Sequence, residues 1–400
     1  MTARARYARI LRTPHVLPLM AAAVVARLPI GIDSLAIVLF LRDRTGSYAA
    51  AGAVSAAFAL GGGAGAPLSG RLIDRFGQRR VLVPLAIVHA GGLAMVVGLA
   101  FLGAPVALLI PAAALAGVAI PPISATMRPL WRSMLGNDPE LLPAAYALDS
   151  VIIELVFVVG PLLTAVATAL VSPVAAIALA IVLVVSGTLA FAASPPSRGW
   201  APDPDARSEG WLGALRSPGL QTLVLVTLPL GFCFGAMEVT LPAFSEDMAS
   251  RAWAGVLLAV WSLGSAAGGI AYGTRAGTVP LGRMYVRLAA VLPLTFLPLA
   301  AAPSVWAMPP LCLIAGVAIA PVLASSNQLV GDVAPAGAVT EAYTWPITAL
   351  VVGIAAGNAV AGVLVESADW RVSFLVGAAC AAIGSVLAFT RRATLGLAPA

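Results

Sequence analysis

The sequence contains no lysine, and charged residues of any kind are scarce. Only 10% of its 400 residues are Asp, Glu, Lys or Arg, whereas 60% are hydrophobic. A set of soluble domains of this length needs far more polar surface than these residues provide. The composition therefore excludes a soluble protein and indicates a membrane protein.

Cysteine and histidine are too few and too scattered to build a metal or disulfide framework. Cys233, Cys312 and Cys380 lie in apolar stretches without the spacing of zinc ligands, and His15 and His89 are isolated. We interpret all five as structural residues. The sequence also lacks a His and Asp pair at helical spacing, which an intramembrane hydrolase needs. It contains no glycine-rich loop that could bind phosphate. We expect no metal, no cofactor and no enzyme activity.

Long apolar stretches fill the sequence instead. Each is long enough to cross the ~30 Å hydrocarbon core of a bilayer as a helix. They lack the alternation of barrel strands, and only helices or closed barrels satisfy their backbone groups in lipid. We therefore predict an all-α integral membrane protein. Its twelve transmembrane helices are expected at residues 15–41, 49–70, 81–102, 104–127, 143–170, 173–193, 219–244, 253–273, 285–302, 304–327, 340–365 and 372–390.

The arginines gather on one side of this predicted topology. Of the 23, 18 fall on one side, four fall on the other, and Arg27 lies deep inside the first helix. Basic residues favour the cytoplasmic side, so both termini are predicted to be cytoplasmic. Topology thus explains the positive charge, and nucleic acid is not expected as a partner. The richness in Arg, Ala, Gly and Val is typical of a GC-rich bacterial genome, and we expect a bacterial cell membrane.

Apolar phrases recur about 200 residues apart. The pentapeptide AGVAI begins at residue 116 and again at 315, an offset of 199. RLPIGID and TLPLGFC match at an offset of 200, AGAVSAAFALG and AGVLLAVWSLG at 203, and AYALDS and AYTWPI at 197. Since four helix pairs keep their order, we predict a tandem repeat of two six-helix bundles. The bundles are expected at 1–194 and 219–400, with a polar linker at 195–218.

The loop between the second and third predicted helices has a distinctive pattern, SGRLIDRFGQRRVL. It resembles the signature of the major facilitator superfamily, G-x-L-A-D-R/K-x-G-R-R/K-x-x-L, with Ile73 and Gln78 as departures. The matching residues are Gly70, Leu72, Asp74, Arg75, Gly77, Arg79 and Leu82.

This resemblance implies a transporter that works by alternating access. It assigns this cytoplasmic gating loop, above all Asp74 and Arg75, to a latch that holds the outward-facing state. Gly77 would permit a tight turn, and Gly70 a close approach of two helix ends. The resemblance also implies that helices one, four, seven and ten line a central cavity for a small-molecule substrate. We expect a functional monomer in the bilayer.

Ionisable residues inside the predicted helices are the candidate functional residues, because a charge at bilayer depth costs about 3 kcal/mol. Arg27 and Glu154 lie at similar depth in helices one and five and are predicted to form a buried ion pair. Their equivalents in the second half, Thr227 and Val351, are both neutral, as expected for a pair lost as a unit. Asp149 lies closer to the cytoplasm and is expected to face water.

Two further carboxyl groups, Asp33 and Glu238, lie in helices one and seven. A carboxyl in an apolar cavity suits a group that loads and releases a proton. We predict that both line the substrate cavity and serve proton coupling or a cationic substrate. The alternative is a carboxyl satisfied by neighbouring backbone or hydroxyl groups.

The fifth predicted helix bears on the transported compound and on the direction of transport. Gly160 and Pro161 resemble the core of the family's antiporter signature G-P-x-x-G-G, although Thr164 and Ala165 replace its final glycines. The resemblance favours proton-coupled efflux of a small amphipathic or hydrophobic compound, with the proton gradient as energy source. The alternatives are proton-coupled uptake of a small metabolite and a non-transporting membrane protein, such as a scramblase or membrane enzyme.

Overall fold

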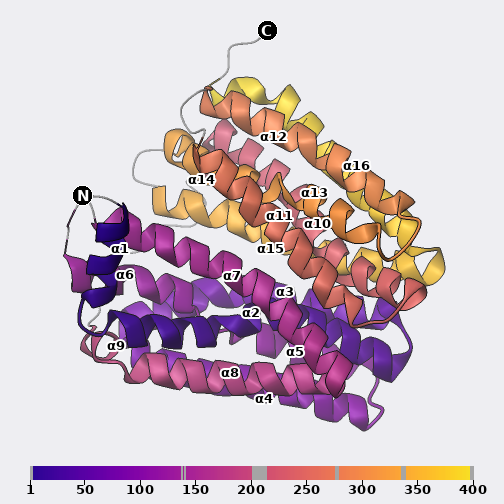
Figure 1. The fold of residues 1–400 in the computed structure, drawn as a ribbon, viewed down its shortest axis with the longest axis horizontal. Coiled ribbons are helices and arrows are strands. Elements are labelled where there is room, and N and C mark those ends of the chain that lie inside the picture. The colour runs from indigo at the N-terminus through magenta and orange to yellow at the C-terminus, as the bar shows by residue number, and fades with distance from the viewer. Residues whose placement is uncertain are drawn as a thin grey trace. The chain divides into compact units, whose positions relative to one another are not determined.

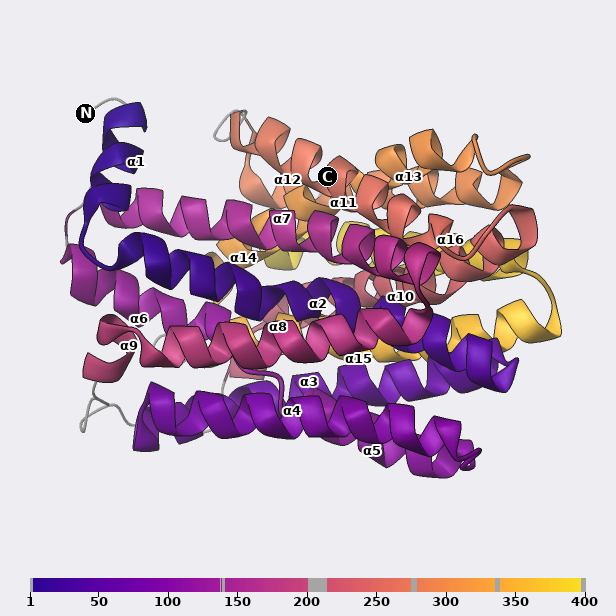
Figure 2. The ribbon, with the colours of Figure 1, turned by 60° about the horizontal axis from the view of Figure 1, so that its bottom comes forward.

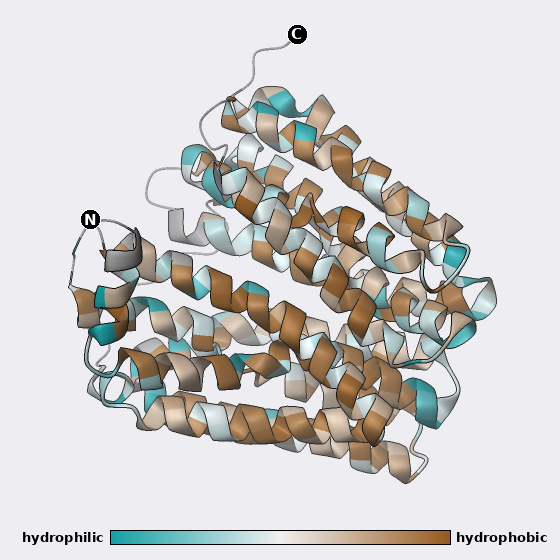
Figure 3. Ribbon diagram, viewed as in Figure 1, coloured by the Kyte–Doolittle hydropathy of each residue, from teal (hydrophilic) through white to brown (hydrophobic). Residues whose placement is uncertain are grey.

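Helices make up the whole regular structure of the described residues. The computed structural model describes residues 3–136, 138, 141–200, 214–274, 279–334 and 339–396. Within these ranges, twelve helical segments are long and apolar enough to cross a membrane, and each overlaps one predicted stretch. Large apolar side chains such as Leu170 and Ile270 are exposed on their outer faces, and the most hydrophilic residues lie mainly toward helix ends (Figure 3). The predicted all-helical membrane protein is confirmed.

Nine of these segments are single helices, and three are built from two pieces. The single helices are α2 (Val16–Thr45), α3 (Tyr48–Phe76), α4 (Gln78–Phe101), α7 (Leu141–Leu170), α8 (Pro173–Ala193), α10 (Pro218–Met248), α11 (Trp253–Thr274), α15 (Val339–Ser367) and α16 (Trp370–Thr390). The two-piece segments are α5 (Val106–Val118) with α6 (Ile123–Leu135), α12 (Leu281–Phe296) with η2 (Leu297–Ala301), and α13 (Met308–Gly316) with α14 (Ile319–Val333). Short helices are α1 (Ala3–Arg12), α9 (Pro195–Gly199), η1 (Ala214–Arg216) and η3 (Arg392–Leu395).

The chain divides into two compact units. The first comprises Met1–Ile37 and Gly61–Ala206, and the second comprises Val38–Leu60 and Arg207–Ala400. In the first unit, α4 packs against α5 and against α8 (Figures 1 and 2). In the second unit, α10 packs against α15 and α16, and α11 against α13. The middle of the predicted linker, residues 201–213, lies outside the described residues.

The two units repeat a helix contact at equivalent positions. In the first unit, a Cβ atom on Gly65 would overlap the carbonyl oxygen of Val118. In the second unit, a Cβ atom on Gly268 would overlap the carbonyl oxygen of Val317. These residues are related by the same offsets, 203 and 199, that relate the matching phrases. Glycine is required at both places because the backbones touch.

Each AGVAI segment coincides with a helix break. In the first unit, α5 ends at Val118 and α6 begins only at Ile123, after two prolines. In the second unit, α13 ends at Gly316 and α14 begins at Ile319. In the first break, the backbone N–H of Ile120 donates to Gly117. The carbonyl of Ala116 therefore does not receive the helical hydrogen bond that residue 120 would have donated.

Candidate functional site

A buried carboxyl and imidazole lie together inside the first unit. Asp33 on α2 is 3% exposed and His89 on α4 is 1% exposed. The Nε2 atom of His89 is 3.3 Å from Oδ2 of Asp33. The other ring nitrogen, Nδ1, is 2.8 Å from the carbonyl oxygen of Ala116 on α5. The second carboxylate oxygen, Oδ1 of Asp33, is buried without a hydrogen-bond partner.

The local packing of α4 against α5 explains how the imidazole reaches that carbonyl. Gly92 lies three residues after His89, on the same face of α4. A Cβ atom on Gly92 would come within 2.9 Å of Ala116 atoms, so the two helices touch at this point. The contact brings the Ala116 carbonyl within hydrogen-bonding distance of the ring.

The sequence pattern favours a structural interpretation of His89 and does not indicate its contact with Asp33. The available signal was that His89 is the one titratable residue in the third predicted stretch, 81–102. Asp33, by contrast, was predicted correctly to be a buried ionisable residue. The sequence did not reveal its partner, because the two residues are 56 positions apart and meet only through packing.

The predicted ion pair between Arg27 and Glu154 is wrong. The Nη1 atom of Arg27 instead lies 2.7 Å from Oδ1 of Asp149, and the Arg27 side chain is fully buried. Both helices start on the same side of the predicted topology, and a helical side chain leans toward the start of its own helix. The long arginine therefore reaches about one turn below the depth of its Cα atom. Asp149, which is expected to face water, has a side chain that is 13% exposed and pairs with Arg27.

The Arg27 guanidinium is incompletely satisfied. Its Nε and Nη2 atoms are buried without hydrogen-bond partners. Glu154 is partly buried on α7, and it forms no ion pair with any residue that the structure describes. Asp149 also lines a cavity of about 510 Å³ with Arg128, Arg132 and Tyr146 of the same unit. Arg128 and Arg132 are exposed, so Asp149 connects the buried Arg27 to a cavity with exposed charges on its wall.

Gly160, from the antiporter-like motif, forms a close helix contact. A Cβ atom on Gly160 would lie 2.6 Å from the carbonyl carbon of Gly31 on α2. A Cβ atom on Gly31 would lie 2.6 Å from the carbonyl oxygen of Val156. The contact joins α2 to α7, and Pro161 follows directly within α7. This part of the motif packs helices together.

The gating loop is partly described. Gly77 has φ of +86°, in the region that favours glycine, so the predicted tight turn is confirmed. A Cβ atom on Gly70 would meet nothing within 4 Å, so the predicted close approach there is not found among the described atoms. Arg75 and Arg79 are exposed, and the side chain of Asp74 lies outside the described part of the structure. The latch remains a prediction.

Gln78, a departure from the family pattern, is buried beside this loop. Its Nε2 donates to the carbonyl oxygen of Thr126 at 3.2 Å, and its Oε1 accepts from Ser197 at 3.0 Å. Gln78 thereby ties the start of α4 to α6 and to α9.

In the second unit, Glu238 lies on α10 and is partly exposed. A polar cluster that the sequence analysis did not single out surrounds Glu246, near the end of the same helix. Glu246 accepts hydrogen bonds from Arg42 at 3.1 Å, from Tyr48 at 2.8 Å and from Arg251 at 2.8 Å. The hydrogen bond to Glu246 raises the pKa of Arg251, so this guanidinium stays charged.

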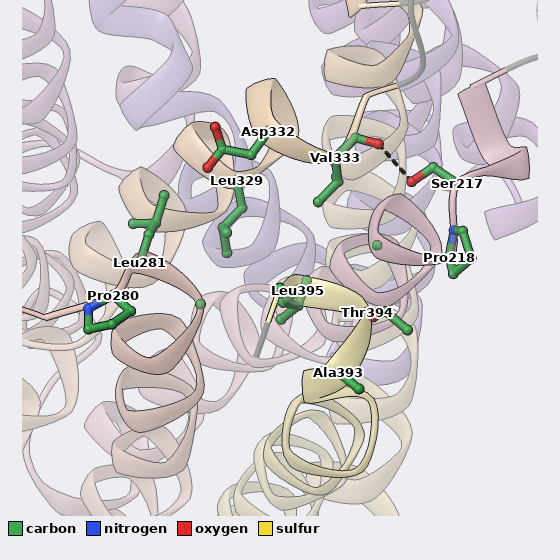
Figure 4. A pocket seen from close by; sticks show the side chains of 13 residues that line it. Ser217, Pro218, Pro280, Leu281, Leu329, Asp332, Val333, Ala393, Thr394 and Leu395 are labelled. Atoms are coloured by element: carbon green, nitrogen blue, oxygen red, sulfur yellow. Dashed lines mark hydrogen bonds between the residues drawn. The ribbon is translucent and has the colours of Figure 1, made fainter. Parts of the chain in front are cut away.

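A cavity of about 690 Å³ in the second unit is lined by none of the predicted site residues (Figure 4). It lies where α10, α12 and η3 approach the end of α14. Ser217 donates to the carbonyl oxygen of Val333 at 2.7 Å across one side of it, and Asp332 is the one carboxylate among its described lining residues. We assign it no role in transport.

The three cysteines are free thiols, and Cys233 and Cys312 are buried. This agrees with their interpretation as small packing residues. Within the described ranges, no group of three or more His, Cys, Asp or Glu side chains could hold a metal ion.

Comparisons with known proteins agree on one family and one fold. The family model described as Major Facilitator Superfamily matches residues 19–345. No curated protein matches the chain by sequence. Among solved structures, the nucleoside transporter NupG is 14% identical with a TM-score of 0.75, and the match covers 96% of this chain and 100% of that one.

Two further solved structures show the same fold. The POT family transporter PepTSo is 14% identical with a TM-score of 0.75, over 96% of this chain and 98% of that one. A bacterial homolog of the human lysosomal transporter Spinster is 15% identical with a TM-score of 0.73, over 96% and 99%. At such low identity these similarities establish the fold alone.

Proposed function

Because the chain belongs to the major facilitator superfamily, we propose that it is a proton-coupled exporter of small amphipathic or hydrophobic compounds. Family membership and the shared fold indicate a transporter rather than an enzyme. The proposal adds the proton as coupling ion, export as direction, and alternating access as mechanism. It also places the protein in a bacterial cell membrane as a functional monomer, with both termini in the cytoplasm.

The observation that carries this proposal is the environment of Asp33. Its carboxyl is 3% exposed inside a membrane-spanning helix, and one of its oxygens has no hydrogen-bond partner. A buried carboxylate without donors is strongly disfavoured, so such a group is stable only when a proton or a cation neutralises it. Such a carboxyl takes up a proton when it is buried and can release the proton when water reaches it. It is therefore suited to carry a proton across a membrane.

The proposal is tested in proteoliposomes that contain the pH-sensitive dye pyranine and carry an imposed pH gradient. We expect ethidium, an amphipathic cation, to move against the proton flux, with both movements dependent on the protein. Asp33→Asn should abolish ethidium-driven proton movement while ethidium counterflow continues. Asp332→Asn is the matched control, because Asp332 is an exposed carboxylate at the end of α14. Unchanged coupling in Asp33→Asn would refute the role of Asp33.

Uptake is tested in the same vesicles. The similar fold of a nucleoside transporter and of a POT family peptide transporter makes uridine and dialanine suitable probes. Movement of either probe in the same direction as protons would contradict export and identify a symporter.

A further inference from the structure

We propose that Asp33 and His89 form one proton-binding site that holds a single shared proton, whose loss separates α2 from α4 and α5. The role of this site in transport rests on the proposed proton coupling. The site itself follows from the geometry of three groups in the first unit.

The first group is the Ala116 carbonyl, which determines the tautomer of the imidazole. A carbonyl oxygen can only accept a hydrogen bond, so the Nδ1 atom 2.8 Å away must carry a hydrogen. In a neutral imidazole with hydrogen on Nδ1, the other nitrogen, Nε2, has a bare lone pair. That nitrogen is the atom that lies 3.3 Å from Oδ2 of Asp33.

Two bare acceptors at this distance repel each other, so the pair needs a proton between them. The proton can rest on Nε2, giving imidazolium and carboxylate, or on Oδ2, giving neutral imidazole and carboxylic acid. In both forms the pair holds one titratable proton and has no net charge. Loss of the proton to water leaves the pair with a charge of −1.

The helix break makes the Ala116 carbonyl available. In an unbroken α5, this oxygen would accept the backbone N–H of Ile120, which here donates to Gly117. The break occurs at both AGVAI segments, but Cys233 stands at the position equivalent to Asp33 in the second unit. Its thiol donates to the carbonyl of Gly377 at 3.3 Å. The break is thus repeated, whereas the titratable pair occurs in the first unit.

Among the described residues, the elements that pack against α4 offer no group close enough to replace the lost proton; α9 carries the exposed Arg198, beside the start of α4. Neither α5 nor α8, which both pack against α4, contains a titratable residue. On α4 itself, Arg79 and Arg80 lie at the start of the helix, about three turns before His89.

Further described charges lie on α2 itself and on α7, which touches α2 at Gly31 and Gly160. Arg27 is six residues before Asp33 on α2 and is held by Asp149. Glu154 on α7 is itself acidic and would add to the repulsion. The deprotonated carboxylate would therefore remain buried without a donor, and contact with water relieves this only if α2 moves away from α4 and α5. Proton loss is thus linked to opening.

The tautomer can be measured directly, because the chain contains only two histidines, His15 and His89. The full-length protein labelled with ¹⁵N-histidine in lipid nanodiscs should give two imidazole spectra, and His15→Asn assigns them. Asparagine suits this position, since His15 has φ of +66°. We expect Nδ1 of His89 to carry a hydrogen, and Asp33→Asn to change the Nε2 signal. A hydrogen only on Nε2, or a His89 spectrum unaffected by Asp33→Asn, would overturn the proposal.

The number of protons is tested by combining variants in the ethidium and pyranine assay. If the two residues hold one proton, His89→Gln, Asp33→Asn and the double variant should lose proton coupling to the same extent. His15→Asn should retain wild-type coupling. If His89→Gln remains coupled, Asp33 acts alone and the shared site is refuted. If wild-type protein moves no protons with ethidium although the NMR result holds, the proposed function fails and the shared site stands.

Discussion

The two units share their helix contacts but differ in what they bury. The first unit contains Arg27 paired with Asp149, together with Asp33 and His89, in its membrane interior. At the equivalent positions the second unit has Thr227 for Arg27, Pro346 for Asp149 and Cys233 for Asp33. The glycine contacts, in contrast, recur in both units. Helix packing was thus retained in both copies, whereas buried charge was retained in one.

Thr227, which stands at the position equivalent to Arg27, is satisfied within its own helix. Thr227 donates to the carbonyl of Leu223 at 2.7 Å in its own helix. The described charge network of this unit surrounds Glu246, which is 26% exposed at the end of α10. The comparison indicates that the buried titratable pair of Asp33 and His89 belongs to the first unit. In the second unit, the ion pairs of Glu246 connect helix ends.

The largest effect is expected from Asp149→Ala. It leaves a fully buried guanidinium without its carboxylate, which costs about 3–5 kcal/mol. Adding Arg27→Thr, which introduces the residue of the second unit, should recover most of this loss. The midpoint of thermal unfolding in detergent measures both effects.

Glu154→Ala is the control for this pair, because Glu154 forms no ion pair in the described structure. We expect a small change in its unfolding midpoint. Equal destabilisation by Glu154→Ala and Asp149→Ala would contradict the assignment of Asp149 as the partner of Arg27.

An intermediate and equal effect is expected from Gly31→Ala and Gly231→Ala. A Cβ atom on Gly31 would overlap the carbonyl oxygen of Val156, and one on Gly231 that of Leu350. Overpacking of this kind costs about 1–3 kcal/mol in either unit. Unfolding midpoints of the two variants should fall by similar amounts.

Gly98→Ala is the matched control, since a Cβ atom there meets nothing within 4 Å. It should stabilise α4 slightly, because alanine favours a helix by about 1 kcal/mol over glycine. If Gly31→Ala lowers the unfolding midpoint and Gly231→Ala does not, the helix contact is not equally important to the stability of the two units.

The smallest effect is expected from Glu246→Gln. The network is partly exposed, so losing its charge should cost about 1 kcal/mol or less. Because salt screens exposed ion pairs, the difference between wild type and Glu246→Gln should shrink in about 1 M salt. Asp332→Asn should show no such salt-dependent difference. A large, salt-independent loss in Glu246→Gln would mean that the second unit also depends on buried charge.

The sequence by itself determined the membrane class, the twelve helical spans and the family, and it predicted the repeat. These properties depend on local composition and on spacing along the chain, because a segment enters a bilayer according to its own hydropathy. The tight turn at Gly77 was predicted for the same reason, because a positive φ is a property of the local backbone. The sequence also identified Arg27 and Asp33 as unusual, because charges are rare in apolar stretches.

Tertiary structure alone decided which partners these charges meet. Arg27 and Glu154 are at similar depth along their helices, but the direction of the side chain selects Asp149. His89 gains its role from a helix contact at Gly92 and from a carbonyl freed by the break at AGVAI. Such partners depend on side-chain direction and on contacts between distant segments, and neither is encoded in the hydropathy of one stretch.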